Sequence, residues 1–296
     1  ELRLYQAVRG AVPVVDAAVC KLIRLSGGVK VLCDDLETQT ALRTFLERVN
    51  AGRGQHGIEA FLSQYLDSLL VYGGAVGEMV PAAGNRTLAA LLCGRLEQVE
   101  LREGESPLDF RICGPDEHGS MAELPYQELL LFTPLHPEAA HPYGVSMLRG
   151  IPFMADILMK IYHTIGVNWE RCGNVRFAVT CRDGEGSAAQ RGQALAQEWS
   201  RAMQETRSGD VRDLVAVGDV DIRVIGADAP VLDSQVPVRQ VMEQIVAKTG
   251  IPPFMLGLNW NSTERMSAQQ ADMLTTEITA LRRTLTPVVE KICRMW

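Results

Sequence analysis

The chain has 296 residues, of which 47% are hydrophobic and 22% are charged, a composition that fits one or two folded domains and excludes wholesale disorder. No apolar stretch approaches the roughly 18 residues that a membrane-spanning helix needs. The net charge of −7 disfavours a protein that grips nucleic acid through many phosphate contacts, but it is compatible with one that lets DNA slide past. Seven scattered cysteines without a Cys-x-x-Cys pair indicate reduced thiols in a cytosolic compartment.

The first half of the sequence predicts helices followed by short strands. Apolar residues recur at helical spacing over 4–25, where Pro13 should kink or split the helix. A short strand over Val29–Cys33 is followed by helices over Thr38–Asn50, capped by Thr38 or the preceding acids, and Gly57–Tyr72. Strand patterns then recur at Ala75–Pro81, Thr87–Cys93, Leu96–Leu101, Asp109–Cys113 and Glu128–Phe132. Mixed strands and helices predict an α+β domain.

The second half predicts two long helices that flank a small insert. Ser146 should cap a helix that runs to about Arg171, and a second helix should cover Asp233–Thr249. The insert between them predicts a strand over 175–181, a helix over 187–206 and strands over 213–217 and 220–225. A last long helix should begin at Ser267 and be disturbed at Pro287.

A loop separates the last two predicted helices. Pro252 and Pro253 prevent the preceding helix from continuing, and Gly257 lets the chain turn. The residues that follow are polar apart from Leu258 and Trp260. They are Leu258, Asn259, Trp260, Asn261, Ser262, Thr263, Glu264 and Arg265. An alternative interpretation makes Trp260 a core anchor for an ordinary surface loop.

No pattern in the sequence amounts to an active site. Gly52–Gly57 matches the Gly-x-Gly-x-x-Gly spelling of a dinucleotide loop, but a predicted helix precedes it and no ribose-binding acid follows at the required distance. His136 and His141 lie in a proline-rich loop rather than at helical zinc-ligand spacing. We therefore expect no catalytic residue, no metal and no cofactor.

The apolar faces of the two long helices indicate assembly. The aliphatic face of the first long helix is ordinary core in the simplest interpretation. It consists of Leu148, Ile151, Ile157, Leu158, Ile161, Ile165 and Trp169. Two helices joined by a small insert have little else in the chain to cover them. They would have to bury apolar surface against other copies, which suggests a ring or another assembly.

Several motifs, in order along the chain, resemble the portal proteins of tailed double-stranded DNA bacteriophages and prophages. The strongest is Gly250-Ile-Pro-Pro-Phe-Met-Leu-Gly257, followed by Ala268-Gln-Gln, a long helix and Thr286-Pro-Val-Val-Glu290. Others are Tyr143-Gly-Val-Ser146, Asp67-Ser-Leu-Leu-Val-Tyr-Gly73 before a strand that carries Glu78, and Tyr5-Gln-Ala-Val-Arg9. The resemblance departs at Gly74-Ala75-Val76, where the family often has Asn and an aromatic residue.

The resemblance implies a division of the chain into an α+β wing, long stem helices and a small α/β clip insert. The wing would cover 1–145, the stem helices 146–171 and 231–249, the clip 172–230, the tunnel loop 250–266, and a helix returning to the wing 267–296. A C-terminal crown would be absent. Leu258–Arg265 would face DNA, with Pro252, Pro253 and Gly257 as hinges. Arg191, Glu198, Arg201 and Glu205 of the clip would contact partners, unless they form a solvated helix face.

The resemblance also implies a function without catalysis. The chain would form a homo-oligomeric ring, twelve-fold in the family, at one capsid vertex of the virion, after assembly in the bacterial cytoplasm. The ring would pass double-stranded DNA during packaging and ejection through transient, sequence-independent contacts. It would dock terminase, capsid and head-completion proteins as a head–tail connector, without contact with a membrane.

The sequence is also compatible with two functions from other classes. One is an adaptor or scaffold protein that assembles without a channel. The other is a nucleotide-binding enzyme that uses Gly52–Gly57.

Overall fold

The computed structural model describes residues 1–84, 87–106, 109–139, 142–173, 176–181, 193, 196–197, 200, 220–225, 233–258, 260 and 264–296. The chain divides into two compact units. The first comprises Glu1–Leu158 and Pro237–Trp296, and the second comprises Met159–Val236. The insert expected over 172–230 lies within the second unit, together with parts of the helices that flank it.

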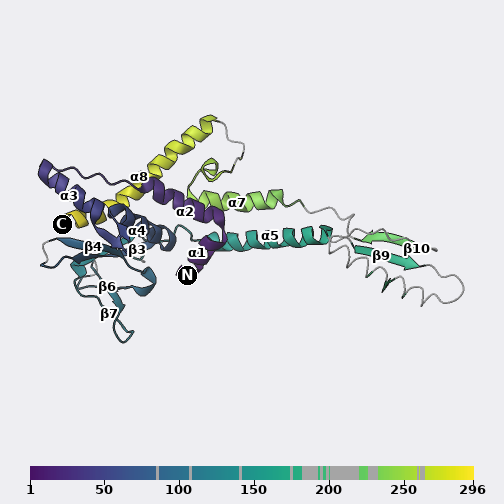
Figure 1. The fold of residues 1–296 in the computed structure, drawn as a ribbon, viewed down its shortest axis with the longest axis horizontal. Helices are drawn as coiled ribbons and strands as arrows, with labels where there is room; N and C mark the ends of the chain where they lie inside the picture. Colours follow the sequence, from purple (N-terminus) through teal and green to yellow (C-terminus); the bar gives the residue numbers. More distant parts are fainter. Residues whose placement is uncertain are drawn as a thin grey trace. The chain divides into compact units, whose positions relative to one another are not determined.

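The N-terminal part of the first unit is helical (Figure 1). Its helices are α1 (Leu2–Ala11), α2 (Pro13–Ser26), α3 (Leu36–Arg48) and α4 (Ile58–Tyr72). The predicted break at Pro13 is confirmed. Val12 has extended dihedral angles, φ −116° and ψ 96°, and Pro13 stands in the first turn of α2, where its missing N–H costs no helical hydrogen bond. The carboxylate of Asp35 caps α3 by accepting a 2.7 Å hydrogen bond from the backbone N–H of Thr38.

Helix α4 packs against a five-stranded sheet. Its strands, in spatial order, are β2 (Gln55–His56), β1 (Asn50–Gly52), β4 (Leu88–Cys93), β3 (Gly74–Pro81) and β8 (Leu130–Pro134). The central strand β3 is antiparallel to both β4 and β8, whereas β1 is parallel to β4. Strands β3, β4 and β8 confirm three predicted strands, but the β1–β2 hairpin was not predicted.

A second sheet has three antiparallel strands in the order β5 (Glu100–Glu103), β6 (Phe110–Pro115) and β7 (Met121–Glu123). The strand expected over Leu96–Leu101 is wrong in its first half, because Leu96–Gln98 form a 3-10 turn (η1) and β5 starts only at Glu100. A second 3-10 turn, η2 (Gln127–Leu129), precedes β8. In the sequence, the three-stranded sheet is therefore an insertion between β4 and β8, and it is preceded by η1 and followed by η2.

The strand predicted over Val29–Cys33 is absent. The segment between α2 and α3 has no helix or strand, and none of the strands that the structure describes pairs with it. Its alternating apolar pattern is nevertheless reflected in its burial, because Val29, Val31 and Cys33 pack against the core while Lys30 and Leu32 are exposed. The pattern correctly predicts an extended chain but not a partner for it.

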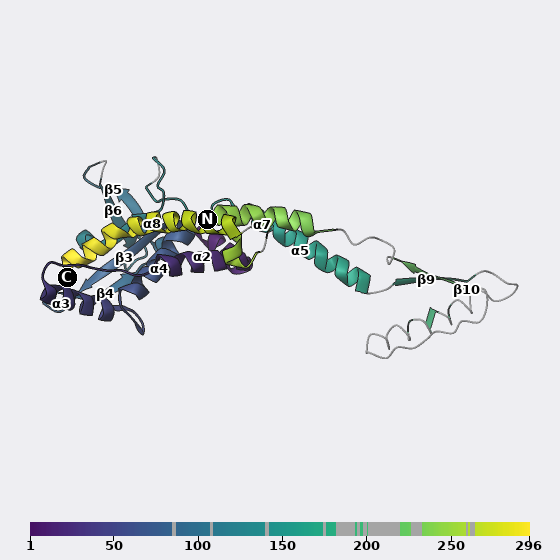
Figure 2. The same cartoon turned by 90° about the horizontal axis from the view of Figure 1, so that it is seen from above.

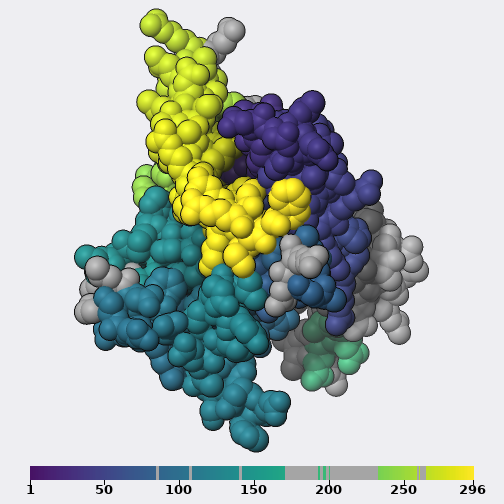
Figure 3. Space-filling model, turned by 90° about the vertical axis from the view of Figure 1, so that its left-hand side faces the viewer, coloured from purple at the N-terminus to yellow at the C-terminus, as the bar shows by residue number. Residues whose placement is uncertain are grey.

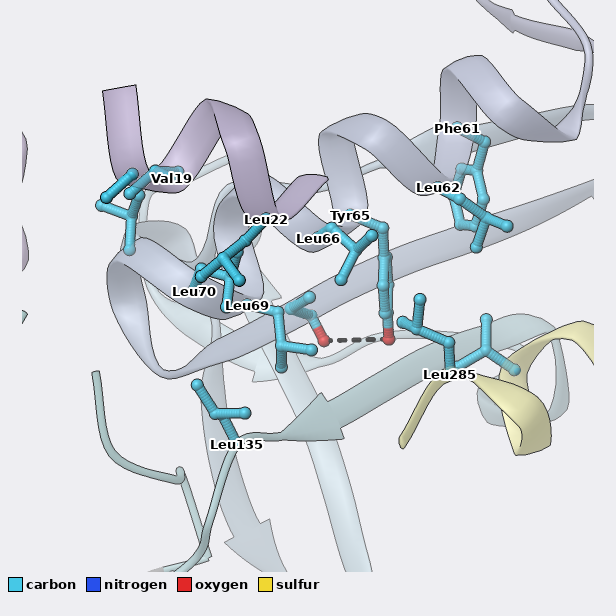
Figure 4. Packing of buried hydrophobic residues seen from close by; sticks show 14 of the residues in the cluster. Val19, Leu22, Phe61, Leu62, Tyr65, Leu66, Leu69, Leu70, Leu135 and Leu285 are labelled. Carbon is cyan, nitrogen blue, oxygen red and sulfur yellow. Dashed lines mark hydrogen bonds between the residues drawn. The ribbon is translucent and has the colours of Figure 1, made fainter. Parts of the chain in front are cut away.

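Tyr65 is at the centre of the core (Figure 4). It projects from α4, is fully buried, and its hydroxyl lies 2.9 Å from Thr133 Oγ1 and 3.1 Å from the carbonyl oxygen of Ala75. Burial raises the pKa of Tyr65 above its ordinary value, so the hydroxyl stays protonated. One buried phenol therefore ties α4 to both β3 and β8.

The long C-terminal helix α8 (Glu264–Met295) closes this core. It passes alongside α2 and the sheet (Figure 2), and its last turns reach the surface between the N-terminal helices and the strands (Figure 3). Arg282 donates hydrogen bonds to the carbonyl oxygens of Leu25, Ser26 and Gly27, at 2.9, 3.3 and 3.1 Å, and so binds the C-terminal end of α2. The disturbance expected at Pro287 is wrong: the helix continues, because Leu285, Val288 and Ile292 on its inner face are buried.

Two chain segments cross where α4 ends. Gly73 (φ 84°) ends α4, and Gly144 (φ 78°) passes so close that a side-chain carbon added to it would lie 2.2 Å from the carbonyl oxygen of Gly73. The hydroxyl of Ser146 donates a 2.6 Å hydrogen bond to Val71 O and accepts one of 2.9 Å from Leu148 N–H. Ser146 therefore caps a turn that precedes the next helix.

That helix, α5 (Ile151–Gly173), begins five residues later than the sequence predicts and contributes to both units. In the second unit, β9 (Arg176–Cys181) pairs antiparallel with β10 (Val220–Ile225), which confirms two predicted strands. Helix α7 (Gln235–Thr249) begins two residues after the predicted Asp233, whose carboxylate accepts a 2.9 Å hydrogen bond from Gln235 N–H. The strand expected over 213–217 lies outside the described residues, as does most of the helix expected over 187–206.

The crossing predicts a large difference between two glycine substitutions. Gly144→Ala should destabilise the first unit by about 1–2 kcal/mol for the left-handed backbone conformation and by about 1–3 kcal/mol more for the steric clash. Gly119→Ala is the matched control, because Gly119 has a similar φ of 79° but open space around it, and it should lose only the first amount. Urea denaturation measures both. Equal losses of unfolding free energy would contradict the close approach.

Candidate functional site

The site predicted from the sequence begins where α7 ends. The hydroxyl of Thr249 donates a 2.8 Å hydrogen bond to Val246 O and accepts one of 3.4 Å from Ile251 N–H. Gly250 has a φ of 69°, which turns the chain out of the helix. Ile251 is 2% exposed, so the loop leaves α7 from an anchored apolar residue.

Pro252, Pro253 and Gly257 have the backbone geometry expected of them. Pro252 is extended, with φ −56° and ψ 136°, and Pro253 starts a 3-10 turn, η3 (Pro253–Leu256). Gly257 ends the turn in the left-handed region at φ 78°, and its N–H donates to Phe254 O at 3.2 Å. The double proline and the glycine thus define a compact turn rather than an open loop. Their role as hinges for movement stays a prediction.

Trp260 lies over a pocket of about 570 Å³ between α7, η3 and α8. The guanidinium carbon of Arg239 is 6.0 Å from the centre of its ring, and Arg239 Nε also donates a 2.8 Å hydrogen bond to Glu243 Oε1. Neither Arg239 nor Glu243 was predicted as a site residue from the sequence. Their spacing of four residues on a helix is a recognisable ion-pair signal, but it does not indicate Trp260 as the third member.

Gln270 also lines this pocket and was not singled out from the sequence, although it belongs to the quoted Ala268-Gln-Gln motif. Its Oε1 is buried and accepts no hydrogen bond from any residue that the structure describes. Among the described residues of the pocket lining, Arg239 is the only basic one, and it is paired with Glu243. The described lining therefore offers no free cation to hold a phosphate.

The start of α8 corrects the extent of the loop. The helix begins at Glu264 rather than at Ser267, so Glu264 and Arg265 are helical and the loop ends before them. A carboxylate in the first turn favours this earlier start, because it lies at the positive end of the helix dipole. Arg265 is exposed.

The remaining predicted residues divide into two groups. Leu258 and Trp260 are described, and Leu258 N–H donates to Pro253 O at 3.0 Å. Asn259, Asn261, Ser262 and Thr263 of the loop lie outside the described residues, as do the clip residues Arg191, Glu198, Arg201 and Glu205. The structure therefore brings together Trp260, Arg239 and the η3 turn, and the roles proposed for the other residues stay predictions.

The Gly52–Gly57 segment forms the turn of the β1–β2 hairpin and leads into α4. Gly57 N–H is already bonded to Val49 O at 2.8 Å. The Glu59 carboxylate lies in the first turn of α4, where it accepts hydrogen bonds from Gly28 N–H and Val29 N–H at 3.1 and 2.9 Å. A carboxylate at this position repels a phosphate, so the geometry disfavours a nucleotide site.

Within the part of the chain that the structure describes, no group of three His, Cys, Asp or Glu side chains is arranged to hold a metal ion. The described helices include none that is long and apolar enough to cross a bilayer. Free thiols are found at Cys20, Cys33, Cys93, Cys113 and Cys293. Burial raises the pKa of Cys93 to about 12, so this thiol is unreactive at neutral pH.

The Arg239–Trp260 contact predicts a local effect. Arg239→Met should weaken the attachment of the loop by about 0.5–1 kcal/mol and speed hydrogen exchange at the backbone amides of Leu258 and Trp260. Arg43→Met is the matched control, because Arg43 makes the same i,i+4 ion pair with Glu47, at 2.9 Å, on exposed α3. It should leave exchange at the loop unchanged. Unchanged exchange in both variants would show that the ring contact does not hold the loop.

No protein-family model matches the sequence, and no curated protein matches it. Solved structures resemble it in fold. A chain in the neck of the native GTA particle, in a structure computed with C12 symmetry, aligns with a TM-score of 0.73 and 15% sequence identity, covering 96% of this chain and 77% of that one. A chain in the virion of the native gene transfer agent (GTA) particle aligns with a TM-score of 0.66 and 17% identity, covering 88% of this chain and 71% of that one.

A third structure, the neck of the empty GTA particle computed with C6 symmetry, aligns with a TM-score of 0.65 and 17% identity, covering 88% of this chain and 72% of that one. At these identities the likeness establishes the fold. The α+β fold predicted from the sequence is confirmed, and the chain shares it with chains of the gene transfer agent particle.

Proposed function

We propose that this chain is the subunit of a portal, a ring-forming channel at one vertex of a phage-type capsid through which double-stranded DNA enters and leaves. The observation that carries the proposal is the fold likeness, over 96% of the chain, to a chain in the neck of the native GTA particle computed with C12 symmetry. A twelve-fold ring is the corresponding expectation for this protein. The virion is then its location, and its role is structural rather than enzymatic.

The portal-like sequence motifs support the proposal because they occupy related structural positions. Asp67–Gly73 ends α4, and Tyr143–Ser146 crosses it and leads into α5. Gly250–Gly257 forms the turn that joins α7 to α8. Leu70, Ser146 and Gly250, one residue from each motif, line one pocket, so motifs that are distant in sequence lie together in the first unit.

The apolar face of α5 supports assembly into a ring. Ile151, Ala155 and Leu158 are buried, at 1%, 5% and 2% exposed. Helical spacing continues the same face to Tyr162 and Trp169, which are 46% and 70% exposed. A helix of 23 residues, about 34 Å long, therefore presents an apolar surface that neighbouring copies can bury. Head-to-tail packing around a closed axis satisfies every copy equally.

The negative net charge of the chain supports a channel that binds DNA weakly rather than a protein that binds DNA tightly. Duplex DNA carries about one charge per 1.7 Å, so a ring with many free cations along its channel would bind DNA tightly and slow its passage. This chain has a net charge of −7. The proposed tunnel loop over 258–263 contains no basic residue, and Arg265 lies at the start of α8. Weak, replaceable contacts from Asn259, Asn261, Ser262 and Thr263 would guide the duplex without holding it.

The second unit is proposed to supply the clip. Residues 172–230 would meet the terminase during packaging and head-completion proteins afterwards, through polar residues such as Arg191, Glu198, Arg201 and Glu205. The wing over 1–145 would face capsid proteins. The antiparallel pair of β9 and β10 supports an insert with its own local structure.

Negative-stain microscopy of the purified chain tests the proposal against an adaptor or scaffold without a channel. Rings with an open axial hole are the expected result. A closed or linear assembly would favour the adaptor, and robust ATP hydrolysis by the pure protein would contradict a structural role.

The exposed aromatic face of α5 predicts a defect in assembly. Trp169→Ala should weaken each subunit contact by about 2 kcal/mol or more, because large aromatic side chains dominate interface energies. Analytical ultracentrifugation should show smaller species, while urea denaturation shows an unchanged first unit.

Tyr126→Asn is the matched control for exposure, since Tyr126 is 69% exposed on the strand-rich side of the first unit and asparagine tolerates its φ of 56°. It should leave the sedimentation profile intact. If the Trp169 variant assembles as the unsubstituted chain does, the exposed face of α5 is not part of the subunit interface.

The proposed tunnel loop predicts a charge effect on DNA movement. Replacing Asn259 and Asn261 by lysine should slow packaging, because each subunit adds two phosphate-binding cations, and raised salt should restore part of the rate. Replacement of both by glutamine keeps polarity without charge and should package normally. The measurement is the length of DNA protected from nuclease over time. Normal packaging by the lysine variant at low salt would place the loop away from DNA.

A further inference from the structure

The segment between α2 and α3 has unused backbone hydrogen-bonding groups. Its start is fixed, because the Glu59 carboxylate accepts hydrogen bonds from Gly28 and Val29, and its end approaches Gln39, whose Oε1 lies 3.4 Å from Cys33 N. Between these points, the N–H and C=O groups of Lys30, Val31 and Leu32 make no hydrogen bond to any described residue. An extended chain with free backbone groups is a template for an added β-strand.

The exposed side chains of this segment are unusual for a solvent-facing loop. Leu32 is 85% exposed, and Leu36, at the start of α3, is 76% exposed. Residues 29–33 alternate regularly between core-packed and exposed positions, as in a strand of a sheet. An added strand would cover the exposed apolar groups.

An apolar pocket of about 410 Å³ lies against the same segment. Its walls include Leu62 and Leu66 of α4 and Leu285 and Val289 of α8. Ser26 also lines it, is 5% exposed, and its Oγ is buried with no hydrogen-bond partner among the described residues. A buried hydroxyl without a partner costs about 1–3 kcal/mol, so the packing beside this pocket is not optimal within the described chain.

We propose that residues 29–33 bind an extended segment of a different protein by β-strand addition, with apolar side chains of that segment entering the pocket beside Ser26. Backbone pairing supplies the affinity, and the pocket selects leucine-like or phenylalanine-like side chains at alternate positions. The pocket is large enough for two such side chains, which lie on the same face of a strand.

The charges along the edge specify the partner further. Lys30 is exposed near one end, and Asp34 and Glu37 are exposed at the other. An antiparallel segment therefore carries a basic residue at its start and an acidic residue at its end. Residues that oppose each other on paired strands project to the same face, so the two charges lie on the solvent face with Lys30 and Asp34, and the apolar residues lie on the core face. The complementary chemistry is an amphipathic strand of the form basic, apolar, polar, apolar, acidic.

A different protein, rather than a second copy, is the occupant that fits the proposed ring. Pairing of residues 29–33 with the same residues of another copy would be two-fold and would close a dimer, whereas ring subunits contact one another head to tail. This choice of occupant rests on the proposed function. The strand addition itself does not, since it needs only the first unit.

The test uses the full chain and a fluorescent peptide, Thr-Lys-Leu-Thr-Leu-Glu-Thr with blocked ends, in which the leucines share one face and the charges share the other. Fluorescence anisotropy should show saturable binding, at least tenfold weaker for the peptide with both leucines replaced by alanine and weaker when the two charges are exchanged. Hydrogen exchange at residues 30–32 should slow when the peptide is bound. Absence of binding at 1 mM peptide, equal binding of the alanine peptide, or unchanged exchange would overturn the proposal.

Two protein variants distinguish binding in the pocket from nonspecific binding of the peptide to the protein surface. Ser63→Phe places a large side chain at the pocket mouth from an exposed position on α4, and it should weaken binding at least tenfold. Ser63→Ala keeps the mouth open and should bind as the unsubstituted chain does. Equal binding of the phenylalanine variant would overturn the use of the pocket.

The experiment also distinguishes this proposal from the proposed function. Peptide binding by a chain that forms no ring would leave strand addition intact and contradict the portal. Protection of residues 30–32 that rises with protein concentration, without peptide, would identify a second copy as the occupant and overturn the choice of a different protein.

Discussion

The close crossing of the backbones at Gly73 and Gly144 is the constraint on which the first unit depends. Leu135 N–H donates to Gly73 O at 2.8 Å, Val145 N–H to Leu135 O at 2.6 Å, and Met147 N–H to Leu70 O at 3.1 Å. These bonds join the end of α4, the end of β8 and the approach to α5. Neither glycine has room for a side chain, so direct contact of the two main chains sets the distance between these segments. That distance in turn fixes where α5 and the end of β8 lie relative to α4.

The parts of the fold that sequence patterns predict well are those in which the periodic apolar face is also the core face. In α4, Phe61, Leu62, Tyr65 and Leu69 recur at helical spacing and are all buried. Local geometry was predictable for the same reason at Pro13, Pro252, Pro253 and Gly257, where restricted or permissive φ angles act on the chain directly. In such places the local sequence pattern alone determines the local structure.

The parts that were mispredicted depend on partners that are distant in sequence. Val29–Cys33 has a strand pattern, but a strand requires a neighbour, and the chain supplies none in the described part. Pro287 should disturb α8, yet burial of the helix face outweighs one lost hydrogen bond. In the candidate site, the Arg239–Trp260 contact forms only because the η3 turn returns the chain toward α7, and no local signal in either residue reveals that return.

The first unit is assembled from both ends of the chain, and this has a consequence for its biosynthesis. Arg282 of α8 binds carbonyls that are about 255 residues earlier in the sequence, and Leu285 completes the core around Tyr65. The contact order of the unit is therefore high, and its last wall leaves the ribosome after everything else. Residues 1–158 leave the ribosome with an apolar face that α8 has not yet covered. This face stays exposed while the whole second unit is synthesised, and chaperones or early assembly partners have access to it during that period.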